Sequence, residues 1–124
     1  MAFQHNNFVS TDRGVHPAAY GRVVSYQWLR EGPYVHFVYD VFHDVDSAGG
    51  VNGGRPTARA VDRYDFTVRD EPRSVGTGGV IIPAVTPYSD LFHPSKLRLL
   101  DNEPVRACYA YLATQPLGIG TVAV

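Results

Sequence analysis

One stretch of this chain, HDVDSAGG, which begins at His43, brings together residue types that can bind a metal ion. Asp44 and Asp46 form the Asp-x-Asp pattern that opens many calcium-binding loops. A loop of that kind starting at Asp44 would need an oxygen donor at position 48 and a glutamate at position 55, where the chain has Ala48 and Arg55. The pattern therefore indicates a polar strand end that runs into a flexible loop, and we expect no metal site here.

Other residue types that carry catalytic chemistry are present without the spacing that their chemistry needs. No H-E-x-x-H or C-x-x-C motif supports a zinc site, and no G-x-S-x-G motif places a serine nucleophile. Neither of the glycine-rich stretches 49–54 and 76–79 has the lysine followed by Ser or Thr of a phosphate-binding loop. The five histidines are scattered along the chain: His5, His16, His36, His43 and His93. We therefore expect a protein that is not an enzyme and that uses no cofactor.

Composition and charge exclude several classes of partner. The 124 residues carry 11 Lys and Arg against 12 Asp and Glu, so no basic field attracts nucleic acid. No apolar run approaches the roughly 20 residues of a membrane-spanning helix, and MAFQHNNFVS lacks the features of a signal peptide. We expect a soluble protein made in the cytoplasm, with its single cysteine, Cys108, as a buried thiol.

The elements that must position these residues are predicted to be mainly β-strands, since the chain has 8 Tyr and 6 Phe against one Met. Apolar residues alternate over residues 20–29 and 34–42, which predicts two strands joined in a hairpin. In the first strand the alternation places Val24, Tyr26 and Trp28 on one face. The second face of this hairpin is itself partly apolar, so another segment is expected to cover it.

Four further segments complete the expected order of elements. Residues 1–19 are rich in turn formers and are expected to form an irregular N-terminal arm. Residues 44–56 are dense in glycine and too poor in apolar residues to pack, so we expect a mobile loop. A third strand should include residues 63–69, and the short β-branched run 80–82 predicts a fourth strand or an edge pairing.

The last third of the chain changes from strand to helix signals. Thr86-Pro87 provides an N-cap and a first residue for a short helix, and His93-Pro94 ends this helix and can start another. Asn102 is expected to cap a final helix over residues 102–114. The apolar residues of this helix recur at helical spacing and make one stripe: Val105, Cys108, Tyr109 and Leu112.

This stripe needs an apolar surface, and the partly apolar second face of the hairpin is the available one. We therefore expect a single domain over residues 20–124 of the α+β class, mostly β: a small antiparallel sheet or sandwich with short C-terminal helices that cover one face. The apolar tail, residues 117–124, is expected to dock on its own sheet or on a neighbouring subunit.

Three motifs, mainly at the two ends of the chain, resemble a known family. They are HPAAYGRV, which begins at His16, VHFVY, which begins at Val35, and PVRACYAYLATQP, which ends at Pro116. Together they resemble small bacteriophage tail-module structural proteins, which carry an N-A-Y-x-R-V-like first strand and an A-Y-x-Y-L-K-T-like C-terminal helix. The resemblance implies a non-enzymatic structural protein of the virion that belongs to the tail, the baseplate or the fibre attachment.

Such a role implies contacts with other virion structural proteins and with further copies of the chain. The candidate interface residues lie at the two chain ends: Phe3, Phe8, Leu117, Ile119, Val122 and Val124. Two alternatives stay open. A capsid decoration protein would make symmetric contacts with a shell, and a carbohydrate-binding module would expose aromatic side chains such as Trp28 as a platform.

Overall fold

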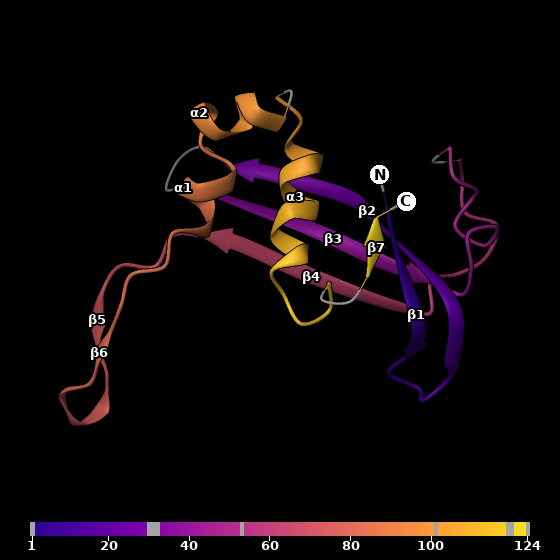
Figure 1. Ribbon diagram of the computed structural model, residues 1–124, viewed down its shortest axis with the longest axis horizontal. Coiled ribbons are helices and arrows are strands. Elements are labelled where there is room, and N and C mark those ends of the chain that lie inside the picture. Colours follow the sequence, from indigo (N-terminus) through magenta and orange to yellow (C-terminus); the bar gives the residue numbers. More distant parts are fainter. Residues whose placement is uncertain (1, 30–32, 53, 101, 119–120, 124) are drawn as a thin grey trace.

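A computed structural model describes residues 2–29, 33–52, 54–100, 102–118 and 121–123, and in these ranges the chain forms a five-stranded antiparallel sheet with helices on one face (Figure 1). The strand order is β4-β3-β2-β1-β7. In chain order these strands are β1 (Phe3–Val9), β2 (Val15–Leu29), β3 (Tyr34–Phe42), β4 (Asp62–Arg69) and β7 (Val122–Ala123). The predicted fold class, mostly β with short C-terminal helices, is confirmed.

The predicted hairpin is confirmed as β2 and β3, which pair in antiparallel register at the centre of the sheet. The register shifts at Val24, where β2 has one residue more than its partner strand. Such a bulge changes the side to which the neighbouring residues point. Val23 therefore shares a face with Tyr26 and Trp28, and the expectation that Val24 lies on that face is wrong. Residues 30–32, which join the two strands before Pro33, lie outside the described residues.

The N-terminal segment forms a strand, and the expectation of an irregular arm over residues 1–19 is wrong. β1 pairs with the first half of β2, from Phe3 opposite Gly21 to Val9 opposite Val15. Asn7 has a positive φ of 54° inside this strand, a conformation that asparagine tolerates better than most residues. The exposed asparagine positions hide the apolar alternation, so the sequence signal for this strand is weak.

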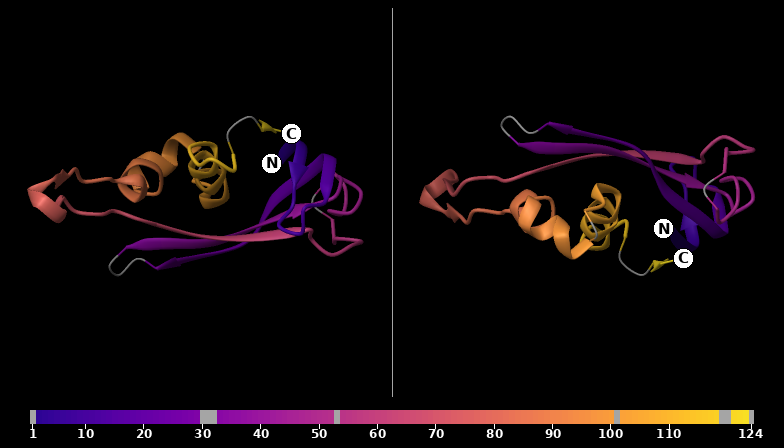
Figure 2. Two further views of the ribbon diagram at one scale, coloured as in Figure 1. Left: turned by 90° about the horizontal axis from the view of Figure 1, so that it is seen from below. Right: turned by 90° about the horizontal axis from the view of Figure 1, so that it is seen from above.

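Four short helical segments lie on one side of the sheet (Figure 2): α1 (Pro87–Leu91), α2 (Pro94–Leu97), η2 (Arg98–Leu100) and α3 (Pro104–Ala113). The predicted stripe of α3 faces the sheet, with Cys108, Tyr109 and Leu112 buried. It packs on alternate residues of β3, which are all buried: Val35, Phe37, Tyr39 and Val41. The helices thus cover the strongly apolar face of the central hairpin. The expectation that they cover its second face is wrong, because burial favours the more apolar surface.

The helix starts follow the predicted signals at two of three positions. Thr86 and His93 occupy the N-cap positions of α1 and α2. The third expectation is wrong, because Glu103 precedes α3 and Asn102 lies one residue further out. Asn102 has a φ of 56°, so it turns the chain between η2 and α3 instead of capping the helix.

The glycine-rich stretch 44–56 packs on the second face of the sheet, so the expectation that it cannot pack is wrong. Ala48 is fully buried in a small cluster with Tyr20 and Phe42. Gly49 has a φ of 97°, and a Cβ at this position would lie 2.3 Å from a backbone carbonyl oxygen of the same loop. Glycine is required here because the chain passes close to itself. One small buried side chain is enough to anchor the loop.

Candidate functional site

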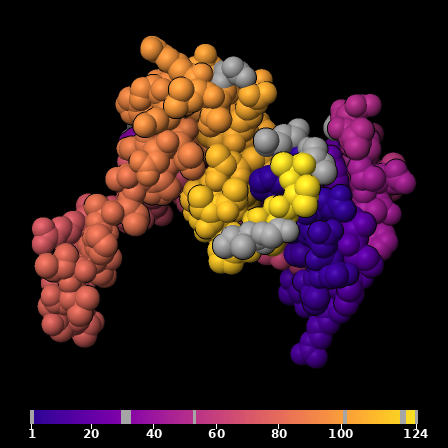
Figure 3. All heavy atoms as spheres, viewed as in Figure 1, coloured from indigo at the N-terminus to yellow at the C-terminus, as the bar shows by residue number. Residues whose placement is uncertain are grey.

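A two-stranded hairpin, residues 71–85, projects from the body of the protein (Figure 3), and we call it the projecting hairpin. Its strands are β5 (Ser74–Val75) and β6 (Ile81–Ile82), and the 3-10 turn η1 (Thr77–Gly79) closes its tip. The prediction of a short strand in the run 80–82 is therefore confirmed, but the strand pairs with β5 in a ladder separate from the main sheet and not at the edge of that sheet.

Backbone hydrogen bonds hold the projecting hairpin together at both ends. At its base, Glu71 and Val85 exchange two bonds of 2.8 and 3.1 Å. Near its tip, the N–H of Gly76 donates to the carbonyl oxygen of Val80 at 2.6 Å. Gly78 has a φ of 74°, which glycine adopts without strain. The turn residues of the sequence therefore build the tip.

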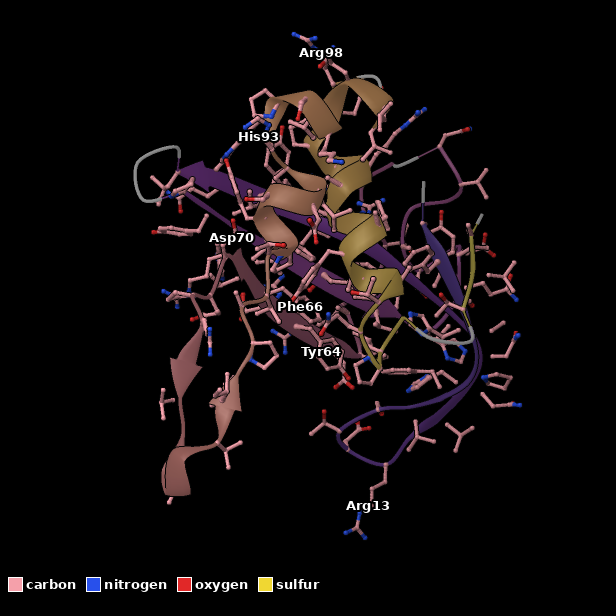
Figure 4. All side chains as sticks on the ribbon, turned by 60° about the vertical axis from the view of Figure 1, so that its left-hand side comes forward. Arg13, Tyr64, Phe66, Asp70, His93 and Arg98 are labelled. Atoms are coloured by element: carbon pink, nitrogen blue, oxygen red, sulfur yellow. The ribbon has the colours of Figure 1, made fainter. Side chains whose placement is uncertain are left out.

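Asp70 lies at the base of the projecting hairpin, at the end of β4 (Figure 4). Its carboxylate accepts hydrogen bonds from the backbone N–H of Ser89, at 3.1 Å, and from the hydroxyl of Ser89. Because Asp70 follows β4 and Ser89 lies in α1, these bonds tie the end of the sheet strand to the helix that follows the hairpin.

Beyond Glu71 and Arg73 at its base, the surface of the projecting hairpin is aliphatic and uncharged. Its large apolar side chains are between 50 and 72 % exposed: Val75, Val80, Ile81, Ile82 and Val85. No charged residue occurs from Ser74 to Val85. Apolar surface gathered in this way on one element marks an interaction site, because its burial removes it from water.

A groove of about 630 Å³ continues this surface at the base of the projecting hairpin, between α1 and α3. Val85, Pro87, Leu91 and Tyr111 supply its apolar lining. The projecting hairpin and this groove together form a candidate interface, and the sequence predictions placed the interface residues elsewhere.

Of the predicted interface residues in β1 and the tail, the structure places three against the core. Phe3 is buried, and its ring packs edge-on against Tyr109 with 5.2 Å between ring centroids. Phe8 and Leu117 are partly buried against the same core. Phe3 is therefore not available to a partner, because α3 already covers it.

The tail docks on its own sheet, which is one of the two predicted outcomes. Gln4 of β1 pairs with Val122 of β7, and the side chain of Val122 is 53 % exposed. The predicted interface residues Ile119 and Val124 lie outside the described residues. Val122 is thus the described tail residue that offers the most surface to a partner.

A polar cluster lies at the turn between β1 and β2. Ser10 is buried, and its hydroxyl donates a hydrogen bond to the carboxylate of Asp12. This carboxylate also accepts the backbone N–H of Gly14 at 3.0 Å. The bond from Ser10, followed by that from Gly14, lowers the pKa of Asp12. The ionised carboxylate of Asp12 therefore stabilises the turn between β1 and β2.

Two histidines that are 27 residues apart extend this cluster. His16 Nε2 lies 3.3 Å from the hydroxyl of Ser10, and His16 Nδ1 lies 2.9 Å from His43 Nδ1. In serine hydrolases the serine hydroxyl donates to the imidazole. Here the hydroxyl donates to Asp12, so Ser10 is not arranged as a nucleophile.

The stretch HDVDSAGG, in which we expected no metal site, contributes to the fold of the loop that follows β3. Asp44 accepts a hydrogen bond from the N–H of Ser47 at 2.8 Å and caps the first turn of the loop. Across the residues that the structure describes, no three His, Cys, Asp or Glu side chains converge to hold a metal ion.

In the described part of the chain no helix is long and apolar enough to cross a membrane.

A pocket of about 590 Å³ lies beside Trp28, the residue expected to be exposed in a carbohydrate-binding module. Tyr88, Pro33 and Leu97 contribute to its lining. The indole N–H of Trp28 donates to the hydroxyl of Tyr88 at 2.8 Å, and the side chain is half-buried. The polar edge of the indole is therefore occupied within the chain.

Comparison with known proteins gives no match: no family model covers the chain, and no curated protein and no solved structure is significantly similar to it. What the protein does is therefore inferred from its own residues and their geometry.

Proposed function

We propose that this chain is a non-enzymatic structural protein of a bacteriophage virion, a part of the tail, the baseplate or the fibre attachment that acts through protein–protein contacts. The projecting hairpin carries the proposal, because its uncharged aliphatic side chains are exposed to water. Burial of apolar surface against a partner contributes roughly 25 cal/mol per Å². A chain with such an element gains stability when it is assembled.

The family resemblance supports the proposal through the elements that its motifs occupy. HPAAYGRV lies in β2, VHFVY lies in β3, and PVRACYAYLATQP contains α3. These elements build the core, whereas the projecting hairpin lies outside all three motifs. The resemblance therefore concerns the scaffold and does not extend to the projecting hairpin.

The environment of the single thiol supports a role without nucleophilic catalysis. Cys108 is fully buried on the side of α3 that faces the sheet, and burial raises the pKa of its thiol to about 12. A thiol acts as a nucleophile in its ionised form. At neutral pH this thiol stays protonated and inaccessible, as expected of a core residue in a structural protein.

The test is a binding measurement with the purified tail, baseplate and capsid proteins of the phage genome that encodes the chain. Light scattering should find a complex with a tail or baseplate protein, and Ile81→Lys in the projecting hairpin should weaken it. Leu99→Lys is the matched control, because Leu99 is 80 % exposed and lies in η2. A complex with the capsid protein alone would favour a decoration protein, and no complex with any of them would overturn the proposal.

Carbohydrate binding is a second candidate, favoured by the pocket beside Trp28. Because the chain has a single tryptophan, its fluorescence reports on this pocket alone. A saturable change of the emission on addition of sugars, lost in Tyr88→Phe, would support this candidate. Weak quenching by iodide and indifference to sugars would support the structural role.

A further inference from the structure

We propose that His16 and His43 bind one Cu(II) or Ni(II) ion through their Nδ1 atoms, with Ser10 orienting the ring of His16. The two Nδ1 atoms lie 2.9 Å apart. His43 belongs to the stretch whose spacing argued against calcium, and its partner here lies outside that stretch. The inference is independent of the proposed function, since no residue of the projecting hairpin takes part in it.

Both imidazoles are carried by the main sheet. His16 lies in β2, opposite Phe8 of β1. His43 directly follows β3, whose last residue, Phe42, pairs with Tyr20 of β2. Ligands placed by strands are held more precisely than ligands placed by loops alone. The pairing of β2 with its two neighbours therefore brings the two rings together.

The hydrogen bonds of Ser10 determine which nitrogen of His16 is available to a metal ion. The hydroxyl has one proton, and its neighbours on the same turn, the ionised carboxylate of Asp12 and the carbonyl oxygen of Gly14, can only accept it. The hydroxyl therefore accepts from His16, whose Nε2 lies 3.3 Å away and carries the proton of the neutral ring. This leaves a lone pair on Nδ1. Histidines that bind metals are commonly oriented in this way, through the second ring nitrogen.

In the absence of a metal ion, His43 completes the contact by donating its own Nδ1 proton to His16. A metal ion takes the place of this proton when His43 adopts its other tautomer, with the proton on Nε2. His43 is exposed, so its Nε2–H can bond to water. The neutral protein can therefore bind the ion without a net loss of protons.

The separation of the two nitrogens favours one class of metal ion. Bonds from histidine to a metal of this size are about 2.0–2.1 Å long, so two nitrogens 2.9 Å apart subtend an angle of about 90° at the ion. A tetrahedral zinc site would need a separation of about 3.3 Å. A right angle suits the tetragonal geometry of Cu(II) and Ni(II), and Cu(II) binds most tightly in the first-row series. Since no third ligand converges within the described ranges, water completes the coordination.

Acidic side chains near both rings favour a positive ion at this place. Asp12 interacts electrostatically with His16, and Asp44 interacts in the same way with His43. Hydrogen bonds from backbone N–H groups hold both carboxylates in position. Two negative charges at this range lower the energy of a divalent cation without binding it directly.

The first test is calorimetric titration of the protein, without an affinity tag, with CuCl2 and with NiCl2. The wild-type chain should bind one ion. His16→Gln and His43→Gln should each weaken binding on the order of a hundredfold, because one arm of the chelate is lost. His36→Gln is the matched control, since it removes a single imidazole of β3 beside Asp65, and it should keep the wild-type affinity. No binding by the wild-type chain, or equal weakening in all three variants, would overturn the proposal.

The second test is the electron paramagnetic resonance spectrum of the Cu(II) complex. The wild-type spectrum should show splitting by two imidazole nitrogens, and that of His43→Gln saturated with Cu(II) should show splitting by one. Light scattering should find the mass of a single chain, 13.7 kDa, because both ligands belong to the same chain. A single nitrogen in the wild-type complex, or a dimer that forms only with the metal, would overturn the chelate.

The third test addresses Ser10. Ser10→Ala should weaken metal binding about tenfold with an unchanged circular dichroism spectrum, because the ring of His16 loses the partner that orients it. In the metal-free wild-type protein, nitrogen NMR should find the proton of His16 on Nε2. A proton on Nδ1 of His16, or an unchanged affinity in Ser10→Ala, would overturn the orienting role of Ser10.

Discussion

His5 Nε2 and the hydroxyl oxygen of Tyr39 lie 2.7 Å apart inside the core, on β1 and β3, although β2 runs between these strands. The contact crosses β2 at Gly21. A Cβ on Gly21 would lie 1.9 Å from the Tyr39 hydroxyl oxygen, so only glycine leaves room for the ring. This contact ties the first strand to the central strand of the sheet.

Acidification is expected to destabilise the protein through His5. Burial lowers the pKa of His5 below its ordinary value of 6.5, so the unfolded chain binds a proton that the folded chain does not. The contribution of His5 to the free energy of unfolding is therefore complete above pH 6.5 and declines as the pH falls toward the lower pKa of the folded state. Urea unfolding between pH 7.5 and 5 should show this slope, and His5→Gln should reduce it. An unchanged slope in His5→Gln would show that another group causes the pH dependence.

Removal of the Tyr39 hydroxyl is expected to lower the free energy of unfolding by about 1–3 kcal/mol, because the buried imidazole of His5 loses its partner. Tyr39→Phe makes this change and keeps the ring. Tyr26→Phe is the control, since Tyr26 is 45 % exposed, and its effect should stay within about 0.5 kcal/mol. Equal effects in the two variants, measured by denaturant unfolding, would contradict a role for the contact.

Gly21→Ala is expected to cost about 3 kcal/mol or more, because the added methyl group overlaps the Tyr39 ring and the core must shift. Gly76→Ala in the projecting hairpin is the matched control, since its nearest neighbour is the flexible end of Ile82 at 3.2 Å. Thermal unfolding should separate the two variants clearly. Similar midpoints would mean that the sheet accepts a side chain at position 21.

Removal of the tail is expected to destabilise the fold in proportion to what it buries. A chain that ends at Pro116 loses Leu117, which packs on the core, and should lose roughly 1–2 kcal/mol. A chain that ends at Thr121 keeps Leu117 and loses β7, so its stability should change less. If both chains unfold like the wild-type protein, the tail contributes nothing to the core and is available for assembly.

Cys108 is expected to be inert toward thiol reagents in the folded protein, because it is buried and its pKa is raised to about 12. A thiol assay at pH 8 should find no reactive group without urea and one with it. Thr77→Cys places a thiol at the exposed tip of the projecting hairpin and should react at once. Rapid reaction of the wild-type chain would show that α3 opens readily.

The sequence predicted the elements whose signal is local. The alternation of β2 and β3, the third strand and the stripe of α3 were all recognisable, because each pattern depends on residues a few positions apart. β1 was missed, because exposed asparagines break its alternation. The bulge at Val24 was missed as well, because it depends on the register against β3 and not on β2 alone.

The sequence predicted interface residues at the chain ends and none on the projecting hairpin, for a related reason. The apolar residues of the two chain ends resembled the run 80–82 in composition, and only their surroundings distinguish them. Phe3 and Leu117 pack against the core, whereas Ile81 and Ile82 lie on a hairpin that extends away from it.

By itself, the sequence determined that this chain is a mostly β protein with a C-terminal helix, because strand and helix periods are properties of neighbouring residues. The tertiary structure alone decided which sheet face the helix covers, that His5 meets Tyr39 through the space left by Gly21, and that the projecting hairpin keeps its aliphatic side chains in water. These outcomes depend on side chains far apart in the sequence, whose packing volumes and register no local pattern contains.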